Sequence, residues 1–311
     1  MKARNELAQY SSRGPVLATV GVFDGMHKGH QRLLQRLREV SVTRHCLSLA
    51  VTFLRHPLEV LRPDMPVAYL NSQDERLRLL SQSVDTVLPL TFDLELSLLR
   101  AGEFIELLRE AIDLQGLVVG PGFAMGHNRE GAGTVLQSLG KQMHFSVEWV
   151  DGFTLNGKLV SSTAIRQALS DLGSMDEVRR LLGRSYSLQG TVVKGHGRGR
   201  HLGFPTVNLA IEYGRLFPAD GVYSTWAMID GQYLPAATSI GFNSTFGGRI
   251  RTVEAHILDW DKDLYGKEIG LVFVQRIRGQ LHFDSDHALI QQMERDVVQV
   301  RALLKETSQN G

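Results

Sequence analysis

The sequence has very little cysteine and no long apolar run. Its 311 residues include a single cysteine, Cys46, so no intrachain disulfide can form, as expected in a reducing compartment. No stretch approaches the ~20 consecutive apolar residues that cross a bilayer. The N-terminus also lacks the apolar segment of a signal peptide. These absences predict a cytoplasmic protein that does not bind membranes.

Neither sign of charge dominates the chain. It has 34 Lys and Arg against 33 Asp and Glu, a formal net charge of +1. A nucleic-acid scaffold or a polybasic membrane binder would carry a clear basic excess, so neither class is expected. A few locally placed Arg and Lys residues can still bind a small anionic substrate. The composition does not predict the oligomeric state.

Two common nucleotide-binding motifs are missing as well. The sequence contains neither a Walker A motif, GxxxxGK[ST], nor a dinucleotide GxGxxG, which excludes P-loop and ordinary NAD-binding folds. The hydrophobic fraction of 43% is that of a globular protein. A chain of this length favours two domains.

Up to about residue 182, apolar runs typical of buried strands alternate with helical apolar spacing. Strands are predicted at residues 16–23, 46–53, 84–90, 117–120 and 144–150. Helices are predicted within residues 31–40, 72–82 and 103–112. The alternation indicates an α/β, Rossmann-like domain with a parallel sheet covered on both faces. Ser72 and Ser174 each precede a glutamate by three residues and predict capping boxes, and Gly183 predicts a helix end.

From Tyr186 the pattern changes to short runs rich in Val, Ile, Thr, Tyr and Phe, separated by glycine-bearing turns. This pattern favours an antiparallel sheet or closed barrel of about six strands. One long helix follows, and its apolar stripe should pack on the barrel. The stripe consists of Leu289, Met293, Val297, Val300 and Leu304. We therefore expect two domains, residues 1–183 and 184–311.

The segment GVFDGMHKGH, residues 21–30, lies between a predicted strand and a predicted helix. Ligands bind at the carboxyl ends of strands in open α/β sheets, and a helix N-terminus offers free N–H groups to a phosphate. His27 and His30 share a helix face, so both imidazoles can donate to charge that develops on a phosphate. Gly25 and Gly29 let the backbone come close. The HxGH tetrapeptide alone also fits two polar loop histidines.

A second polar segment, VSSTAIR at residues 160–166, has hydroxyls where a helix should begin. Ser161, Ser162 and Thr163 are suited to capping, and Arg166 follows one turn later as a phosphate clamp. Capping explains the hydroxyls but not their pairing with a distant HxGH. Together the two segments resemble the nucleotidyltransferase superfamily, in which such motifs flank the ATP triphosphate. Class I aminoacyl-tRNA synthetases share HxGH but carry a KMSKS-type loop, which is absent here.

Residues 190–210 contain a glycine-rich loop followed by a predicted strand. Lys194 and Arg200 in the loop suit a polyphosphate, because glycine backbone can wrap anionic oxygens. Thr206 and Asn208 alternate on the strand and should point to the same side. Their oxygens are hard ligands, suitable for Mg²⁺ held jointly with nucleotide phosphates. A turn beside a polar strand edge is the alternative.

Glu254 lies between apolar Val253 and Ala255 in another predicted strand. Its side chain therefore faces opposite to theirs, toward solvent or toward the barrel mouth. An exposed glutamate is one interpretation. A general base that removes a proton from an attacking hydroxyl is the other.

Read in order, these segments resemble the prokaryotic bifunctional riboflavin kinase/FAD synthetase family. The similarity runs from about Val16 to Asp296. It includes the motifs GVFDGMHKGH, TFLRHP, GFAMGHNREG, VSSTAIR, LLGRSY, GRHLGFPTVNL, DGVYSTW, VEAHILDW and DLYG. The resemblance implies an N-terminal FMN adenylyltransferase domain and a C-terminal riboflavin kinase, built as a six-stranded Greek-key barrel with a final helix. Its substrates would be riboflavin, FMN and ATP, with Mg²⁺ as cofactor.

The same resemblance implies roles for individual residues. His27, His30 and Arg166 would be catalytic in adenylyl transfer. Glu254 would be the base on the ribityl hydroxyl, while Thr206 and Asn208 would hold Mg²⁺-ATP. Further nucleotide contacts are implied at Gly21, Phe23, Asp24, Gly25, Ser161, Ser162, Thr163, Lys194, Gly195, Gly199 and Arg200.

The sequence departs from the family pattern at Arg55, Gly122, Met125, Ser244 and Gln280. Gly122 replaces an acid or amide and Met125 an aromatic residue, both at the adenylyltransferase site. Restoring Asp or Asn at position 122 should lower the KM for FMN or ATP, provided the backbone there does not need positive φ. Three alternatives follow: a riboflavin kinase with an impaired N-terminal domain, an adenylyltransferase for another phosphate-bearing substrate, and a flavin-binding sensor without turnover.

Overall fold

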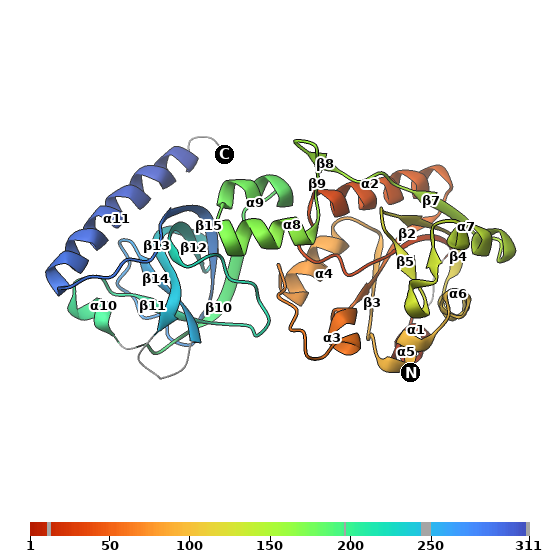
Figure 1. The fold of residues 1–311 in the computed structure, drawn as a ribbon, viewed down its shortest axis with the longest axis horizontal. Helices are drawn as coiled ribbons and strands as arrows, with labels where there is room; N and C mark the ends of the chain where they lie inside the picture. The colour runs from red at the N-terminus through yellow and green to blue at the C-terminus, as the bar shows by residue number, and fades with distance from the viewer. Residues whose placement is uncertain (11–13, 196, 244–249, 309–311) are drawn as a thin grey trace. The chain divides into compact units, whose positions relative to one another are not determined.

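The structure, a computed structural model, describes residues 1–10, 14–195, 197–243 and 250–308. The chain divides into two compact units, Met1–Ser162 and Thr163–Gly311, each with its own sheet (Figure 1). The helices within residues 163–182 therefore group with the C-terminal unit. Ser244 and the FGGR turn lie outside the described residues.

The N-terminal unit is built on five parallel strands in the order β3-β2-β1-β4-β7. Their bounds are β1 Pro15–Val20, β2 Leu47–Phe53, β3 Thr86–Leu90, β4 Asp113–Val119 and β7 Ser146–Trp149. All five predicted strands are therefore confirmed, and so is the parallel α/β sheet. The strand order reverses between β1 and β4, which makes the carboxyl ends of these two strands a topological switch point.

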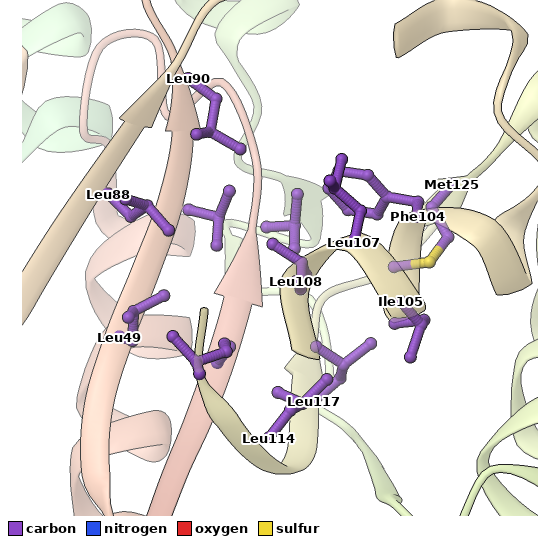
Figure 2. Packing of buried hydrophobic residues seen from close by; sticks show 14 of the residues in the cluster. Leu49, Leu88, Leu90, Phe104, Ile105, Leu107, Leu108, Leu114, Leu117 and Met125 are labelled. Atoms are coloured by element: carbon purple, nitrogen blue, oxygen red, sulfur yellow. The ribbon is translucent and has the colours of Figure 1, made fainter. Parts of the chain in front are cut away.

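Both faces of this sheet are covered, as the apolar runs predict. Leu17 of β1 and Ala50 of β2 face helix α2 (Lys28–Thr43), whose buried side is Leu33, Leu34, Leu37 and Val40. Their sequence neighbours point to the opposite face, where they meet helix α6 (Ala101–Arg109). Figure 2 shows leucines from β2, β3 and β4 packed around Phe104, Ile105 and Leu108 of that helix. Period-two alternation in the strands thus builds two cores from one sheet.

The remaining elements of this unit are short. They are α1 Lys2–Ala8, α3 Pro57–Leu61, α4 Gln73–Ser81, α5 Leu94–Leu98, β5 Ala124–Met125, a 3₁₀ turn His127–Arg129, β6 Gly131–Ala132, α7 Gly133–Gln142, β8 Thr154–Leu155 and β9 Lys158–Leu159. Helix α8 (Ser162–Gln167) then continues into a π-helical turn (Ala168–Leu172) and α9 (Met175–Leu182).

Three residues are predicted to mark helix ends, Ser72, Ser174 and Gly183, and a helix does begin or end at each of them. The predicted capping box is wrong at Ser174. Ser72 Oγ accepts the Glu75 N–H at 3.2 Å and caps α4. Gly183 ends α9 with φ of 77°, the left-handed conformation that glycine favours. Helix α9 does begin after Ser174, but the Ser174 side chain makes no capping hydrogen bond, so that capping-box prediction is wrong. The Ser174 ψ of 86° departs from the extended value of ordinary N-caps, such as the 163° of Ser72.

The C-terminal unit is a closed six-stranded barrel in the order β10-β11-β14-β13-β12-β15. Its strands are β10 Ser187–Val193, β11 Val207–Ile211, β12 Gly221–Ile229, β13 Gln232–Asn243, β14 Ile250–Ile257 and β15 Glu268–Arg278. All neighbours are antiparallel, and β11 pairs with β14 rather than with its successor β12, as in a Greek key. One helical turn, α10 (Arg198–His201), precedes β11.

The chain ends in helix α11 (Asp286–Ser308), which packs on β12, β13 and β15. Its predicted apolar stripe faces the barrel. Val300 and Leu304 are buried in a cluster with Leu258, which also includes Val297. Arg278 of β15 and Asp296 of α11 form a bidentate ion pair that links the helix to the barrel, with Arg278 Nη2 2.7 Å from Asp296 Oδ2.

Candidate active sites

The loop at residues 21–27 joins β1 to α2 at the switch point of the sheet. Phe23, Gly25 and Met26 adopt left-handed φ values of 56°, 81° and 43°. Two of these three residues carry side chains, which seldom take this conformation. Backbone of this kind persists where surrounding contacts fix it, and it is frequent at functional sites.

His27 and His30 come together at the start of α2. His27 is the N-cap, and its Nδ1 accepts the His30 N–H at 3.3 Å. The two imidazoles are stacked with ring centroids 3.7 Å apart, and the Phe23 ring meets His30 edge-on at 5.3 Å. Because Nδ1 of His27 is an acceptor, a neutral His27 carries its proton on Nε2, where it can donate to an anion. Burial, and then the nearby His27, holds the pKa of His30 well below its usual value.

The first turn of α2 adds further donors beside these rings. The N–H groups of Lys28 and Gly29 open the helix and have no acceptor within it. With the helix dipole they form an anion-binding end. A side chain at position 29 would approach the His27 ring to 3.1 Å and the Val160 carbonyl to 3.3 Å, so these groups would have to shift by a few tenths of an ångström to accommodate it.

Residues 69–72, just before α4, are hydrogen-bonded to the loop at residues 21–27. The buried Asp24 carboxylate accepts the Leu70 N–H at 3.0 Å. In return, the buried Asn71 Oδ1 accepts the Gly25 N–H at 3.1 Å. Sequence reasoning assigned Asp24 to the nucleotide and missed Asn71.

Arg76 of α4 is a second residue that sequence reasoning missed. Its guanidinium is almost fully buried and donates to the carbonyls of Phe53 and Leu54 at 2.8 and 3.1 Å. Burial lowers the pKa of Arg76, and the nearby Asp24 carboxylate opposes that shift. Arg76 and Leu80 lie four residues apart on the buried side of α4, so a charge on an apolar helix face was the available signal.

The second motif reaches the same loop through a serine. Ser162 Oγ donates to the Asp24 carbonyl at 2.9 Å. Ser161 and Ser162 close the N-terminal unit, while Thr163 and Arg166 continue along helix α8 as the first residues of the C-terminal unit. The structure thus brings the start of VSSTAIR to the HxGH loop.

A pocket of about 780 Å³ opens at the carboxyl ends of the parallel strands and is lined by residues that follow β1, β2, β3 and β4. Its walls are mostly aromatic and aliphatic, and two arginines lie at it. The residues that line the pocket include Gly21, Phe53, Arg62, Phe92, Phe104, Gly122, Phe123, Met125 and Arg129. This volume and lining suit a flat aromatic ligand with an anionic tail.

Gly122 and Met125, the two departures assigned to the adenylyltransferase site, line this pocket. Gly122 has φ of +68° with open space around it, and its carbonyl accepts from Arg129 at 2.9 Å. Met125 is buried in the core of the unit. The condition attached to restoring Asp or Asn at position 122 therefore fails, because the backbone there does take positive φ.

In the barrel, three polar side chains form one row across neighbouring strands. Asn208 of β11 is directly opposite Glu254 of β14, which is directly opposite Ser239 of β13. Cross-strand partners point to the same face of a sheet. Val253 and Ala255 are buried inside the barrel, so Glu254 faces outward into a cavity. Thr206 lies one residue before β11 and also lines this cavity.

The glycine-rich loop lies directly on these residues. A Cβ at Gly195 would overlap the Asn208 amide, and one at Gly199 would overlap the Phe204 carbonyl and approach Thr206 Oγ1 to 3.2 Å. Lys194 and Arg200 are exposed on the loop. The loop that carries Lys194 and Arg200 thus lies close to Thr206 and Asn208.

The cavity itself measures about 420 Å³. It lies between the outer face of the barrel, residues 281–283 and helix α11, which contributes Leu289, Met293, Asp296 and Val297. Sequence reasoning missed His256, and it identified Gln280 only as a departure from the family pattern. His256 Nδ1 donates to the Pro205 carbonyl at 2.8 Å. Gln280 Nε2 donates to the Ile240 carbonyl at 2.7 Å and contacts Ser239 Oγ at 3.3 Å.

Comparison with known proteins assigns each half separately. Residues 10–164 match the FAD synthetase family and residues 182–304 match the riboflavin kinase family. A bifunctional riboflavin kinase/FMN adenylyltransferase from Pseudomonas fluorescens is 37% identical over 289 residues, 92% of each chain. The protein of the same name from Escherichia coli K12 is 36% identical over 300 residues, 96% of this chain and 95% of that one.

This chain belongs to the bifunctional riboflavin kinase/FMN adenylyltransferase family. The resemblance inferred from the motifs is confirmed, and the presence of both family domains supports the bifunctional interpretation over a lone kinase or a sensor.

A solved structure shares the architecture of this family member from end to end. A crystal structure described as a macrolide-efflux protein from Streptococcus pneumoniae has a TM-score of 0.88 at 30% identity, covering 97% of both chains. That description refers to the other protein. In the described part of the present chain, no helix has both the length and the apolar character needed to cross a membrane.

Proposed function

We propose that this chain phosphorylates riboflavin to FMN with ATP, and then adenylylates FMN to FAD with release of pyrophosphate. The observation that carries the proposal is the position of Glu254. It lies in a cavity wall directly opposite Asn208, beside a glycine-rich loop that carries cations. A carboxylate, an oxygen ligand and a phosphate-binding loop in one place are what phosphoryl transfer to a hydroxyl requires.

In the kinase half, the ribityl hydroxyl oxygen of riboflavin attacks the γ-phosphorus of ATP, and Glu254 accepts the proton of that hydroxyl. The bond from that phosphorus to the β–γ bridging oxygen breaks, and ADP leaves. The amides of the glycine-rich loop, with Lys194 and Arg200, bind the phosphates. The cavity behind Glu254 holds the flavin ring against Leu289 and Met293 of α11.

The donor set fits Mg²⁺ shared with the nucleotide. Thr206 and Asn208 offer a hydroxyl and an amide oxygen, the hard ligands that this ion prefers. No group of three or more His, Cys, Asp or Glu side chains among the described residues could hold a metal alone, so the phosphates would complete the coordination. Bound there, the ion would neutralise charge on the transferred phosphoryl group.

In the N-terminal half, an oxygen of the FMN phosphate attacks the α-phosphorus of ATP, and the bond to the pyrophosphate oxygen breaks. His27 Nε2 and the first N–H groups of α2 stabilise the charge that develops. His30, neutral at neutral pH, supports this arrangement through the ring stack. Arg166 serves as a phosphate clamp. The aromatic pocket holds the isoalloxazine ring of FMN, with Arg62 and Arg129 near its phosphate.

We place the functional boundary between residues 183 and 184. Gly183 ends α9, and the riboflavin kinase match begins at residue 182, which supports this choice. The location in the cytoplasm, where ATP is abundant, stays a prediction.

One time course tests the proposal. Purified full-length protein is incubated with riboflavin, ATP and Mg²⁺, and flavins are separated by chromatography at intervals. FMN should appear first and FAD later, and chelation of divalent ions should stop both. FMN without FAD would indicate an impaired N-terminal half, and neither product would indicate a binding protein.

A further inference from the structure

The loop that carries HxGH is held by a reciprocal pair of buried hydrogen bonds, here called the Asp24–Asn71 clasp. Each partner uses its side chain to bind the backbone next to the other. Asp24 accepts the Leu70 N–H at 3.0 Å, and Asn71 accepts the Gly25 N–H at 3.1 Å. The two side chains are 3% and 2% exposed, so water does not compete for these bonds.

The clasp acts where the backbone most needs support. Left-handed φ values occur at Phe23, which precedes Asp24, and at Gly25, whose N–H is the one bound by Asn71. Met26, the next residue, has a left-handed φ as well. The conformation of Phe23 sets its ring edge-on against His30, and His30 is stacked on His27. A shift at Gly25 would therefore pass directly to both imidazoles.

The amide at position 71 uses its acceptor and not its donor. Asn71 Nδ2 is buried and has no hydrogen-bond partner among the described residues. A buried unsatisfied donor costs free energy; an apolar side chain would avoid that cost but would take the Oδ1 acceptor away from the buried Gly25 N–H. The benefit of the amide is its acceptor, which is directed to the catalytic loop.

We propose that Asn71 is a positioning residue for adenylyl transfer. Its Oδ1 fixes the Gly25 N–H, and so holds the Phe23–His30–His27 stack at the start of α2 in the geometry that the transition state requires. This inference rests on the proposed FAD synthesis, and Asn71 itself touches neither FMN nor ATP.

Two substitutions of matched size separate positioning from packing. Asn71→Leu keeps the number and branching of the side-chain heavy atoms and removes the acceptor. Asn71→Asp keeps the acceptor at Oδ1 and removes the unpartnered donor, but it places a second carboxyl beside the buried Asp24, so thermal unfolding first has to show that this variant folds. Ser72→Ala is the neighbouring control, because it removes the α4 cap at the next residue and leaves the clasp intact.

FAD formation from supplied FMN is measured for each variant as kcat and KM, together with thermal unfolding and FMN formation from riboflavin. We expect Asn71→Leu to lower kcat for FAD at least about 10-fold with both KM values within about 3-fold, since misplaced catalytic groups cost rate. Asn71→Asp should retain at least 10 times the kcat of the leucine variant. Ser72→Ala should lower the unfolding temperature yet keep kcat within about 2-fold, and FMN formation should not change in any variant.

The outcomes are distinguishable. Unchanged kcat in Asn71→Leu, or a folded Asn71→Asp no better than Asn71→Leu, overturns the positioning role while FAD synthesis by the parent stands. Equal loss of kcat in Ser72→Ala would show that stability of this segment, rather than the clasp, sets the rate. A parent protein that makes no FAD overturns the proposed function and this inference with it.

Discussion

Replacing Glu254 with glutamine tests the kinase mechanism most directly. Glutamine keeps the shape of the side chain and its place between Asn208 and Ser239, so the cross-strand row and the cavity wall stay intact. It cannot accept the proton of the hydroxyl. Positioned proton transfer contributes ~10² to 10⁴ in rate, or about 3 to 5 kcal/mol of activation free energy. We expect kcat for FMN formation to fall by about that factor.

The assay is single-turnover phosphorylation of riboflavin, which reports the chemical step without product release. Riboflavin and ATP affinities should stay close to those of the parent, because little ground-state binding is removed. Glu268→Gln is the matched control, since Glu268 is exposed at the start of β15 and faces no cavity residue. FAD formation from supplied FMN should also be unchanged. A Glu254→Gln protein with an undiminished single-turnover rate would refute the base assignment.

Four further predictions concern both halves. His27→Ala or His30→Ala should lower FAD formation about 10²-fold or more with FMN formation unchanged, and wild-type rates in both would make the histidines structural. Gly195→Ala should lower kcat/KM for FMN formation at least about 10-fold, because the new Cβ overlaps the Asn208 amide; an unaffected enzyme would place the loop elsewhere. Gly122→Asp should destabilise the N-terminal unit by ~1 kcal/mol, measured by denaturant unfolding, since φ is +68° and no contact compensates. The fold holds the pKa of His30 below its ordinary value of 6.5, so the unfolded chain binds a proton at this residue before the folded chain does, and the free energy of unfolding falls as the pH drops below 6.5. In His30→Gln the unfolding temperature should therefore fall less between about pH 7.5 and 5.5 than in the parent.

Much of the fold could be predicted from the sequence, because its signals are local and periodic. Each buried parallel strand is a short apolar run, and each covering helix has apolar spacing near 3.6. The barrel strands and the α11 stripe follow from the same reasoning. Ser174 shows where this approach fails. Its spacing to the following glutamate fits a capping box, yet its backbone does not take the dihedrals that would aim the hydroxyl at the helix.

The candidate sites could be predicted only in part. His27, Asn208 and Glu254 stand out because their neighbours in sequence reveal their setting. Asn71 does not, since it acts through a backbone group that is distant in sequence, and no local pattern encodes such a contact. The φ of Gly122 is likewise a property of the folded loop, so the sequence showed the missing side chain but not the reason for its absence.

Helix α11 lines the cavity that contains Glu254 and also packs on the barrel. Leu289 and Met293 line the cavity, while Val300 and Leu304 are buried about two to four turns further along the same helix. The pair between Arg278 and Asp296 joins the two parts. A flavin that binds only the complete cavity is thermodynamically linked to the docking of this helix. The coupling is reciprocal: the free energy by which bound flavin stabilises the docked helix equals the free energy by which the docked helix strengthens flavin binding.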